Sequence, residues 1–139
     1  MESTPRGRRL VAIAEEECWQ LVSTRRWGHL LVVVANHPEL FPVDHLVDGR
    51  SLLVRTEEGT KLRAALGARV GFEVDQVDDD ARLGWTVMLA GYANEVFDTR
   101  ELELAEIDAD EAVWTGDRVH WLRIVPFKVS GRRLVALAS

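Results

Sequence analysis

The stretch FPVDHLVDGRSLLVRTEEGTKLRAAL, residues 41–66, predicts two strands joined by a tight turn and followed by a short helix. Residues 40–47 are mostly apolar and are predicted to form the first strand. Asp48-Gly49 is a strong signal for a β-hairpin turn, which leads into a second strand over residues 50–55. The helix is expected over roughly 60–66. Neighbouring antiparallel strands of this kind indicate a β-hairpin architecture.

The rest of the chain extends this hairpin pattern. Apolar and alternating segments predict four further strands, over residues 27–35, 68–77, 85–97 and 118–135. Gly91 is expected to mark a bulge and Pro126 an edge or bend. Further helices are predicted over 13–25 and 99–107, and residues 1–12, with three arginines, are expected to be a loose arm. The predicted fold is a single, mainly antiparallel β-barrel domain with peripheral helices.

Composition limits the partners of this 139-residue chain. Its net charge of −6 argues against nucleic acid, because binding to the phosphate backbone needs a basic surface. A small phosphorylated ligand needs only a few local donors and is compatible with this charge. Cys18 is the one cysteine, so no disulfide can form within the chain. No signal-like segment or run of about 20 apolar residues is present, so we expect a cytoplasmic protein without a membrane partner.

The junction RTEEGTKL, residues 55–62, concentrates groups that can bind an anion. Arg55 and Lys61 supply positive charge, Thr56 and Thr60 supply hydroxyl groups, and the predicted helix start adds free backbone N–H groups. The alternative is a solvated turn in which the two cations pair with the neighbouring glutamates. Spacing alone does not distinguish these interpretations.

Other common chemistries find little support in the sequence. The histidines are dispersed and the single cysteine lacks a partner, so no zinc site is expected. Neither a G-x-S-x-G nucleophile motif nor a Walker A or dinucleotide fingerprint occurs. The anion-binding junction is therefore the main functional signal in the residues themselves.

The order of the motifs resembles one known family. EECWQLV, WGHLLVV, FPVDHLVDGRSLLVRTEEGTKLRAAL, VGFEVDQVD, GWTVMLAGYANEV and RIVPFKVSGRRL occur in sequence over roughly residues 9–135. This pattern resembles the pyridoxamine 5′-phosphate oxidase-like family of flavin-binding split β-barrels, in particular its small actinobacterial-type members. The resemblance implies a six-stranded antiparallel split barrel. It also implies a homodimer that holds flavin mononucleotide (FMN) in two clefts at the subunit interface.

The resemblance assigns the phosphate of the flavin to the junction described above. Arg55 and Thr56 match the phosphate-binding strand end of the family, and Thr60 and Lys61 match the following loop and helix start. The other matches of the family concern the flavin ring, and they come from three separate strands.

PVDH matches the strand beside the ring, so Val43, Asp44 and His45 are expected to contact the ring edge. Similar family members usually have Asn and Tyr where this chain has Asp44 and His45. An ionised Asp cannot donate a hydrogen bond, and its charge disfavours an anionic reduced flavin. If Asp44 contacts the flavin ring only through its backbone, having Asp instead of Asn at this position does not affect binding.

Two further segments complete the implied flavin site. GWTV places Trp85 and Thr86 near the flavin, with core packing as the alternative role for Trp85. SGRR places Arg132 at the flavin, with Arg133 as the substitute, although a solvated basic segment is the alternative.

The function implied by the resemblance is FMN binding with oxidoreductase activity on a small molecule. No catalytic residue is assigned beyond His45, a candidate proton donor. Alternatives are a reductase that uses the deazaflavin coenzyme, a nitroimidazole-resistance type reductase, and a non-enzymatic module for flavin storage or sensing. Pyridoxamine-phosphate oxidase activity itself is not expected, because the chain is short and SGRRL stands where an RLHDR-like segment would bind the substrate phosphate.

Overall fold

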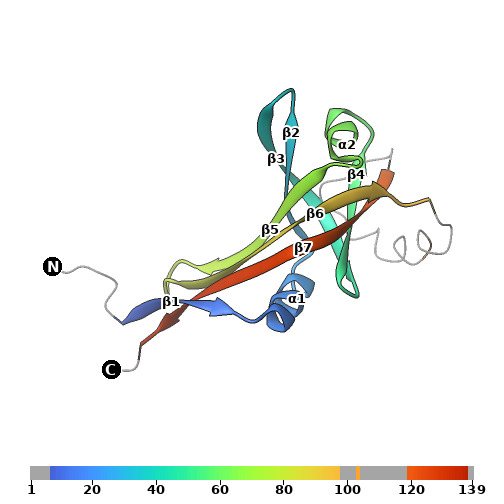
Figure 1. Cartoon of the computed structure of the whole chain (residues 1–139). Helices are drawn as coiled ribbons and strands as arrows, with labels where there is room; N and C mark the ends of the chain where they lie inside the picture. Colours follow the sequence, from blue (N-terminus) through green and yellow to red (C-terminus); the bar gives the residue numbers. More distant parts are fainter. Residues whose placement is uncertain (1–6, 98–102, 104–118, 138–139) are drawn as a thin grey trace.

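A computed structural model describes residues 7–97, 103 and 119–137. One antiparallel sheet dominates it and curls until its ends meet (Figure 1). The strand order is β1-β7-β4-β3-β2-β5-β6, and a further pairing of β6 with β7 closes a ring of six strands. The bounds of the elements are β1 Arg8–Ile13, α1 Glu15–Ser23, β2 Trp27–Val34, β3 His37–Asp48, β4 Ser51–Glu57, α2 Thr60–Ala65, β5 Arg69–Asp78, β6 Leu83–Glu95 and β7 Val119–Ala136. The predicted mainly β fold, a six-stranded antiparallel barrel with peripheral helices, is confirmed.

The hairpin in the opening stretch forms as predicted. Asp48 of β3 pairs with Ser51 of β4, and Gly49 in the turn has a φ angle of 62°. Glycine adopts this left-handed conformation without the steric cost that other residues incur. The helix α2 follows β4 closely and lies at the end of the molecule opposite β1 (Figure 1).

The bulge expected at Gly91 is also present. The register of β6 and β7 shifts between Ala90 and Gly91, and Gly91 lies opposite Pro126. A Cβ atom at position 91 would lie 2.4 Å from the Val125 carbonyl oxygen and 2.7 Å from the Pro126 Cα atom. Strand β7 continues through Pro126 instead of being interrupted there, because the bulge accommodates the residue that lacks an N–H donor.

Replacing Gly91 with alanine should therefore destabilise the barrel. The added methyl group meets backbone atoms, which cannot move without disturbing the β6–β7 ladder, so Gly91→Ala should lower the free energy of unfolding by about 1–3 kcal/mol. Gly71→Ala on β5 is a matched control, because its nearest contacts would be Leu31 side-chain atoms at 3.4 Å. Urea denaturation of both variants measures the difference, and equal stabilities would contradict the proposed clash.

Two predictions of local structure change. The loose arm is wrong from Arg8 onward, since Arg8–Ile13 forms β1 and pairs with residues 131–136 of β7. This pairing links opposite ends of the chain, which local sequence patterns do not reveal. Helix α1 is shorter than the predicted 13–25. The predicted helix over 99–107 lies, except for Glu103, outside the described residues.

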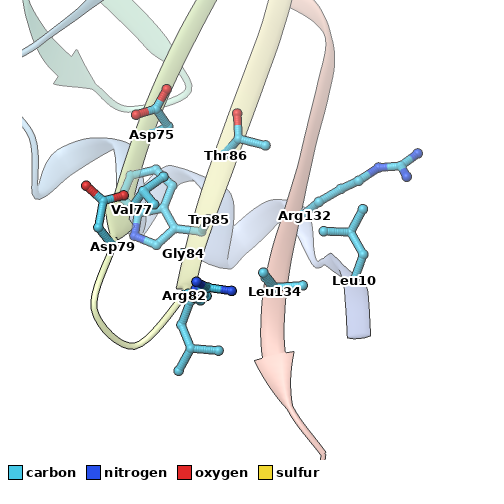
Figure 2. A pocket seen from close by; sticks show the side chains of 11 residues that line it. Leu10, Asp75, Val77, Asp79, Arg82, Gly84, Trp85, Thr86, Arg132 and Leu134 are labelled. Carbon is cyan, nitrogen blue, oxygen red and sulfur yellow. The ribbon is translucent and has the colours of Figure 1, made fainter. Parts of the chain in front are cut away.

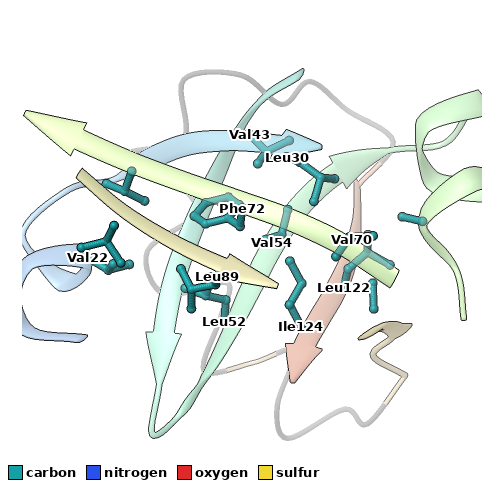
Figure 3. Close-up of a cluster of buried hydrophobic side chains, with 14 of the residues drawn as sticks. Val22, Leu30, Val43, Leu52, Val54, Val70, Phe72, Leu89, Leu122 and Ile124 are labelled. Carbon is teal, nitrogen blue, oxygen red and sulfur yellow. The ribbon is translucent and has the colours of Figure 1, made fainter. Parts of the chain in front are cut away.

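The core fills the inside of the barrel and is built from alternate residues of each strand (Figure 3). Its largest fully buried side chains include Phe72, Leu30, Leu52, Leu89, Leu122 and Ile124. Because side chains alternate between the two faces of a strand, the intervening residues point outward. These outward positions form what we call the outer face, and they carry most of the candidate site. Within the described part of the chain, no helix is long and apolar enough to span a membrane.

Candidate functional site

The cations Arg55 and Lys61 and the carboxylate of Asp44 meet where β3, β4 and α2 come together, and we call these three residues the charge cluster. Asp44 lies directly opposite Arg55 in the β3–β4 register. Lys61 lies in the first turn of α2, with its Nζ atom 5.2 Å from the centroid of the Phe41 ring. Burial lowers the pKa of Lys61, while the negative charges of Glu57 and Asp44 oppose that shift. The partly desolvated ammonium of Lys61 is therefore stabilised by the two nearby carboxylates. A bound anion would add to this stabilisation.

Both threonines of the predicted phosphate site make side-chain hydrogen bonds outside this charge cluster. Thr56 follows Arg55 on the strand and is 1% exposed, and its Oγ1 atom donates to the Glu57 carbonyl oxygen at 3.1 Å. Thr60 Oγ1 accepts a hydrogen bond from Arg63 Nη2 at 3.4 Å. Helix α2 has only six residues, so the anion-binding argument rests on side chains and not on a helix dipole.

Val43 and His45 point into the barrel, away from the outer face. Val43 is 1% exposed and belongs to the core. The His45 Nε2–H donates to the Val22 carbonyl oxygen at 3.0 Å, in the last turn of α1, and the ring packs edge-on against Phe72 at 5.2 Å. Contacts from these two residues to a ligand on the outer face would have to come from the backbone.

The position of His45 indicates a structural role. It is 4% exposed, and its Nδ1 atom is buried without a hydrogen-bond partner among the described residues. Burial, the largest effect, lowers the pKa of His45, although the Val22 carbonyl and the charge of Asp44 oppose the shift. A buried neutral imidazole that supports α1 is poorly placed to donate protons to a ligand, so the structure gives no support to His45 as a catalytic residue.

The burial of His45 predicts that the folded protein loses stability at acid pH. The folded-state pKa of His45 lies below that of the unfolded chain, so unfolding takes up a proton at acid pH. The stability is fully present above about pH 6.5 and should decline below it, with a slope of at most about 1.4 kcal/mol per pH unit. His45→Gln should show a shallower decline in chemical denaturation between pH 7 and 5. His37→Gln, at an exposed position, is the control, and equal slopes in all three proteins would contradict this role.

A second group of predicted residues gathers at the far end of the barrel. Thr86 of β6 lies directly opposite Arg132 of β7, and both border a cavity of about 510 Å³. Figure 2 shows Arg132 extending away from Trp85 and past Leu10. Trp85 lines the same cavity but packs against the barrel core, as the core alternative for this residue anticipated.

The structure distinguishes the two neighbouring arginines. Arg132 is exposed on the same face as Thr86, whereas Arg133 Nη2 forms an ion pair with Glu17 Oε2 of α1 at 2.6 Å. Arg132 is therefore the arginine available to a ligand in the cavity. Arg133 fixes α1 to the barrel.

Sequence patterns did not single out the residues that connect the two groups. Trp27 of β2 lies opposite Asp44, and His29, two residues further along β2, lies opposite Glu73 of β5. Glu73 accepts a hydrogen bond from Thr86 Oγ1 at 3.2 Å. These contacts form a polar band on the outer face, which consists of Asp44, Trp27, His29, Glu73, Thr86 and Arg132. Strand periodicity places each residue outward, but only the register between strands shows that they are neighbours.

The donor set suits an elongated, ring-containing phosphate ester. Arg55 and Lys61 provide positive charge at one end of the polar band, and Arg132 provides it at the other. Between them lie aromatic and hydrogen-bonding side chains. Among residues 7–97, 103 and 119–137, no group of three or more His, Cys, Asp or Glu side chains could hold a metal ion. The arrangement offers charge neutralisation and orientation of a bound molecule.

Comparisons with known proteins give a consistent family relationship. The sequence model of the pyridoxamine 5′-phosphate oxidase family matches residues 14–133. An uncharacterised Mycobacterium tuberculosis protein is 32% identical over 103 residues, which cover 69% of this chain and 67% of that protein. Among solved structures, an FAD-binding protein from Mycobacterium smegmatis is 32% identical with a TM-score of 0.71, covering 90% of this chain and 98% of that one. An FAD-binding protein from Mesorhizobium loti has a TM-score of 0.79 at 21% identity, with 92% and 98% coverage, which shows a shared fold.

Proposed function

Because this chain belongs to the pyridoxamine 5′-phosphate oxidase family, we propose that it binds a flavin nucleotide and acts as a flavin-dependent oxidoreductase on a small molecule. The observation that carries the proposal is the polar band together with the cations Arg55 and Lys61, which lie beside its Asp44 end, while Thr86 and Arg132 form its other end. A flavin supplies redox chemistry, while the surrounding protein binds, orients and shields it.

Within this proposal, Arg55 and Lys61 hold the phosphate beside the flavin ribityl chain. Arginine can bind phosphate with two parallel hydrogen bonds, and lysine adds a point charge. Asp44 lies between these cations in the charge cluster, so much of its negative charge is balanced before any ring approaches. This arrangement supports the backbone interpretation of its ring contact and reduces the conflict with an anionic reduced flavin.

A homodimer is the proposed assembly. An apolar patch lies on part of the outer face and consists of Leu31, Val33, Met88, Tyr92, Val125 and Phe127, each between 38% and 59% exposed. A cavity of about 410 Å³ lies beside Leu31, Met88 and Phe127. Apolar side chains gathered in this way on a single chain commonly mark a protein interface. A second copy covering the patch would also enclose the neighbouring polar band.

The proposed cofactor is FMN, and the FAD bound by the Mycobacterium smegmatis relative makes FAD the other flavin to test. Both contain the same ring and the same first phosphate, so the cations of the charge cluster serve either. The purified protein should be yellow or take up added flavin. Mass spectrometry of the ligand released on denaturation distinguishes FMN, FAD and a deazaflavin coenzyme. A colourless protein that takes up none of them would overturn the proposal.

Enzymatic activity is tested separately from binding. The flavin-loaded protein is mixed with a reduced nicotinamide nucleotide under anaerobic conditions, and the flavin absorbance is followed. Reduction, followed by reoxidation with an added small-molecule acceptor over many cycles, supports an oxidoreductase. A flavin that binds tightly but is neither reduced nor reoxidised catalytically would instead indicate storage or sensing.

A further inference from the structure

Glu73 lies at the centre of a hydrogen-bonded group within the polar band, and flavin binding by itself gives this group no part in proton transfer. Its Oε1 atom is 3.3 Å from His29 Nδ1, and its Oε2 atom accepts from Thr86 Oγ1 at 3.2 Å. The three residues come from β5, β2 and β6, so each contact crosses between strands. The side chains of His29 and Glu73 are 35% and 27% exposed, which leaves them partly accessible from the outer face.

The surroundings of Glu73 favour storage of a proton. Burial raises the pKa of Glu73, and a hydrogen bond with Asp75 and the negative charge of Asp75 raise it further. The hydrogen bonds from His29 and Thr86 act in the opposite direction but do not reverse the shift. Two carboxyl groups placed so closely favour retention of a proton between them, because ionising both is electrostatically unfavourable.

A small cavity beside this group has room for water. It has a volume of about 60 Å³ and is lined by Arg25, Trp27, Gly28, His29, Glu73, Val74 and Asp75. That volume is enough for ordered water beside polar partners. The Trp27 ring packs edge-on against His29, with centroids 5.5 Å apart, and fixes the imidazole at the cavity wall. Among the residues that line this cavity, the charged and titratable groups around Glu73 are Arg25 and His29 on the β2 side and Asp75 on its own strand, and Arg132 lies beyond Thr86 on the β7 side.

We propose that Glu73 and His29 form a proton relay that connects the small cavity to a ligand bound along the polar band, with Thr86 positioning the Glu73 carboxyl. His29 takes up a proton at Nε2 and releases its Nδ1 proton to Glu73 Oε1, which leaves the imidazole neutral. Glu73 then donates that proton to the bound ligand and returns to the carboxylate. The identity of the ligand as a flavin rests on the proposed function, whereas the exchange between Glu73 and His29 does not.

The first test uses the full chain without flavin. Side-chain ¹⁵N NMR follows the His29 ring nitrogens as a function of pH in the wild type and in Glu73→Gln. The wild-type ring should report two inflections, one from the imidazole and one from Glu73, and Glu73→Gln should report one. Glu39→Gln, at an exposed position on β3, should match the wild type. Glu73→Asp should restore the second inflection. A single inflection at the same pH in wild type and Glu73→Gln overturns the relay.

The second test measures proton delivery to bound flavin. The flavin-loaded protein is reduced by a chemical reductant in weak buffer, and a pH-indicator dye reports proton uptake from solution. Proton uptake should slow at least about tenfold in Glu73→Gln and remain at the wild-type rate in Glu39→Gln. Equal rates in the two variants overturn the relay even if flavin binds normally. Failure to bind flavin contradicts the proposed function instead, and the NMR titration still decides whether Glu73 and His29 exchange a proton.

Discussion

Lys61→Ala is expected to weaken flavin binding roughly 10- to 150-fold. The ammonium lies next to Asp44 and Glu57 and is partly desolvated, so its charge is held in place before a ligand arrives. A charged hydrogen bond of this kind contributes about 1.5–3 kcal/mol, which gives the stated change in affinity. Arg55→Ala should have a similar effect, because Arg55 lies on the adjacent strand end opposite Asp44. Quenching of flavin fluorescence during titration measures each dissociation constant.

The matched control is Arg63→Ala on the same helix. Arg63 is an exposed cation whose guanidinium contacts Thr60 Oγ1 at 3.4 Å, so its removal changes the net charge as Lys61→Ala does. If long-range attraction alone drew the phosphate, both variants would lose affinity equally and the charge cluster would not be the phosphate site. Repeating the titrations at higher ionic strength strengthens the distinction, because salt screens exposed charges more than partly buried ones.

Local sequence patterns predicted the elements of the barrel well but not the pairing of its N-terminal strand. The Asp48-Gly49 turn and the Gly91 bulge could be predicted because each depends on glycine and a few neighbouring residues. The pairing of β1 with β7 joins Arg8 to Ala136, and no local pattern encodes a contact over that separation. Segments such as RRLVAI become strands because a partner edge is available to them.

In the candidate site, too, local sequence patterns identified some features, and others appear only through strand pairing. The sequence identified Arg55 and Lys61 through their chemistry and Arg132 through the family resemblance, and the structure places them on or beside the outer face. The alternation of strand residues already implied that neighbours such as Arg55 and Thr56 face opposite ways, but the motif grouped them by proximity in sequence. His29 and Glu73 lie 44 positions apart, so only the β2–β5 register brings them into contact.

Met88→Asp is expected to convert the proposed homodimer into monomers. Met88 lies in the apolar outer patch, is 51% exposed, and borders the cavity beside Leu31 and Phe127. If a second copy covers this patch, an aspartate there would be buried without a partner, at a cost of about 3–5 kcal/mol. The dimer dissociation constant should rise roughly 150-fold to several thousand-fold. Sedimentation velocity over a range of protein concentrations measures this change.

Phe97→Asp provides the comparison that separates burial in an interface from a general effect of an added charge. Phe97 is 77% exposed but follows the end of β6, outside the apolar outer patch. Both substitutions replace an exposed apolar side chain with aspartate, so only the one within the interface should dissociate the dimer. Flavin affinity adds a second criterion, because a cleft enclosed by two subunits should lose its ligand together with its partner. A Met88→Asp protein that stays dimeric would place the interface on another surface.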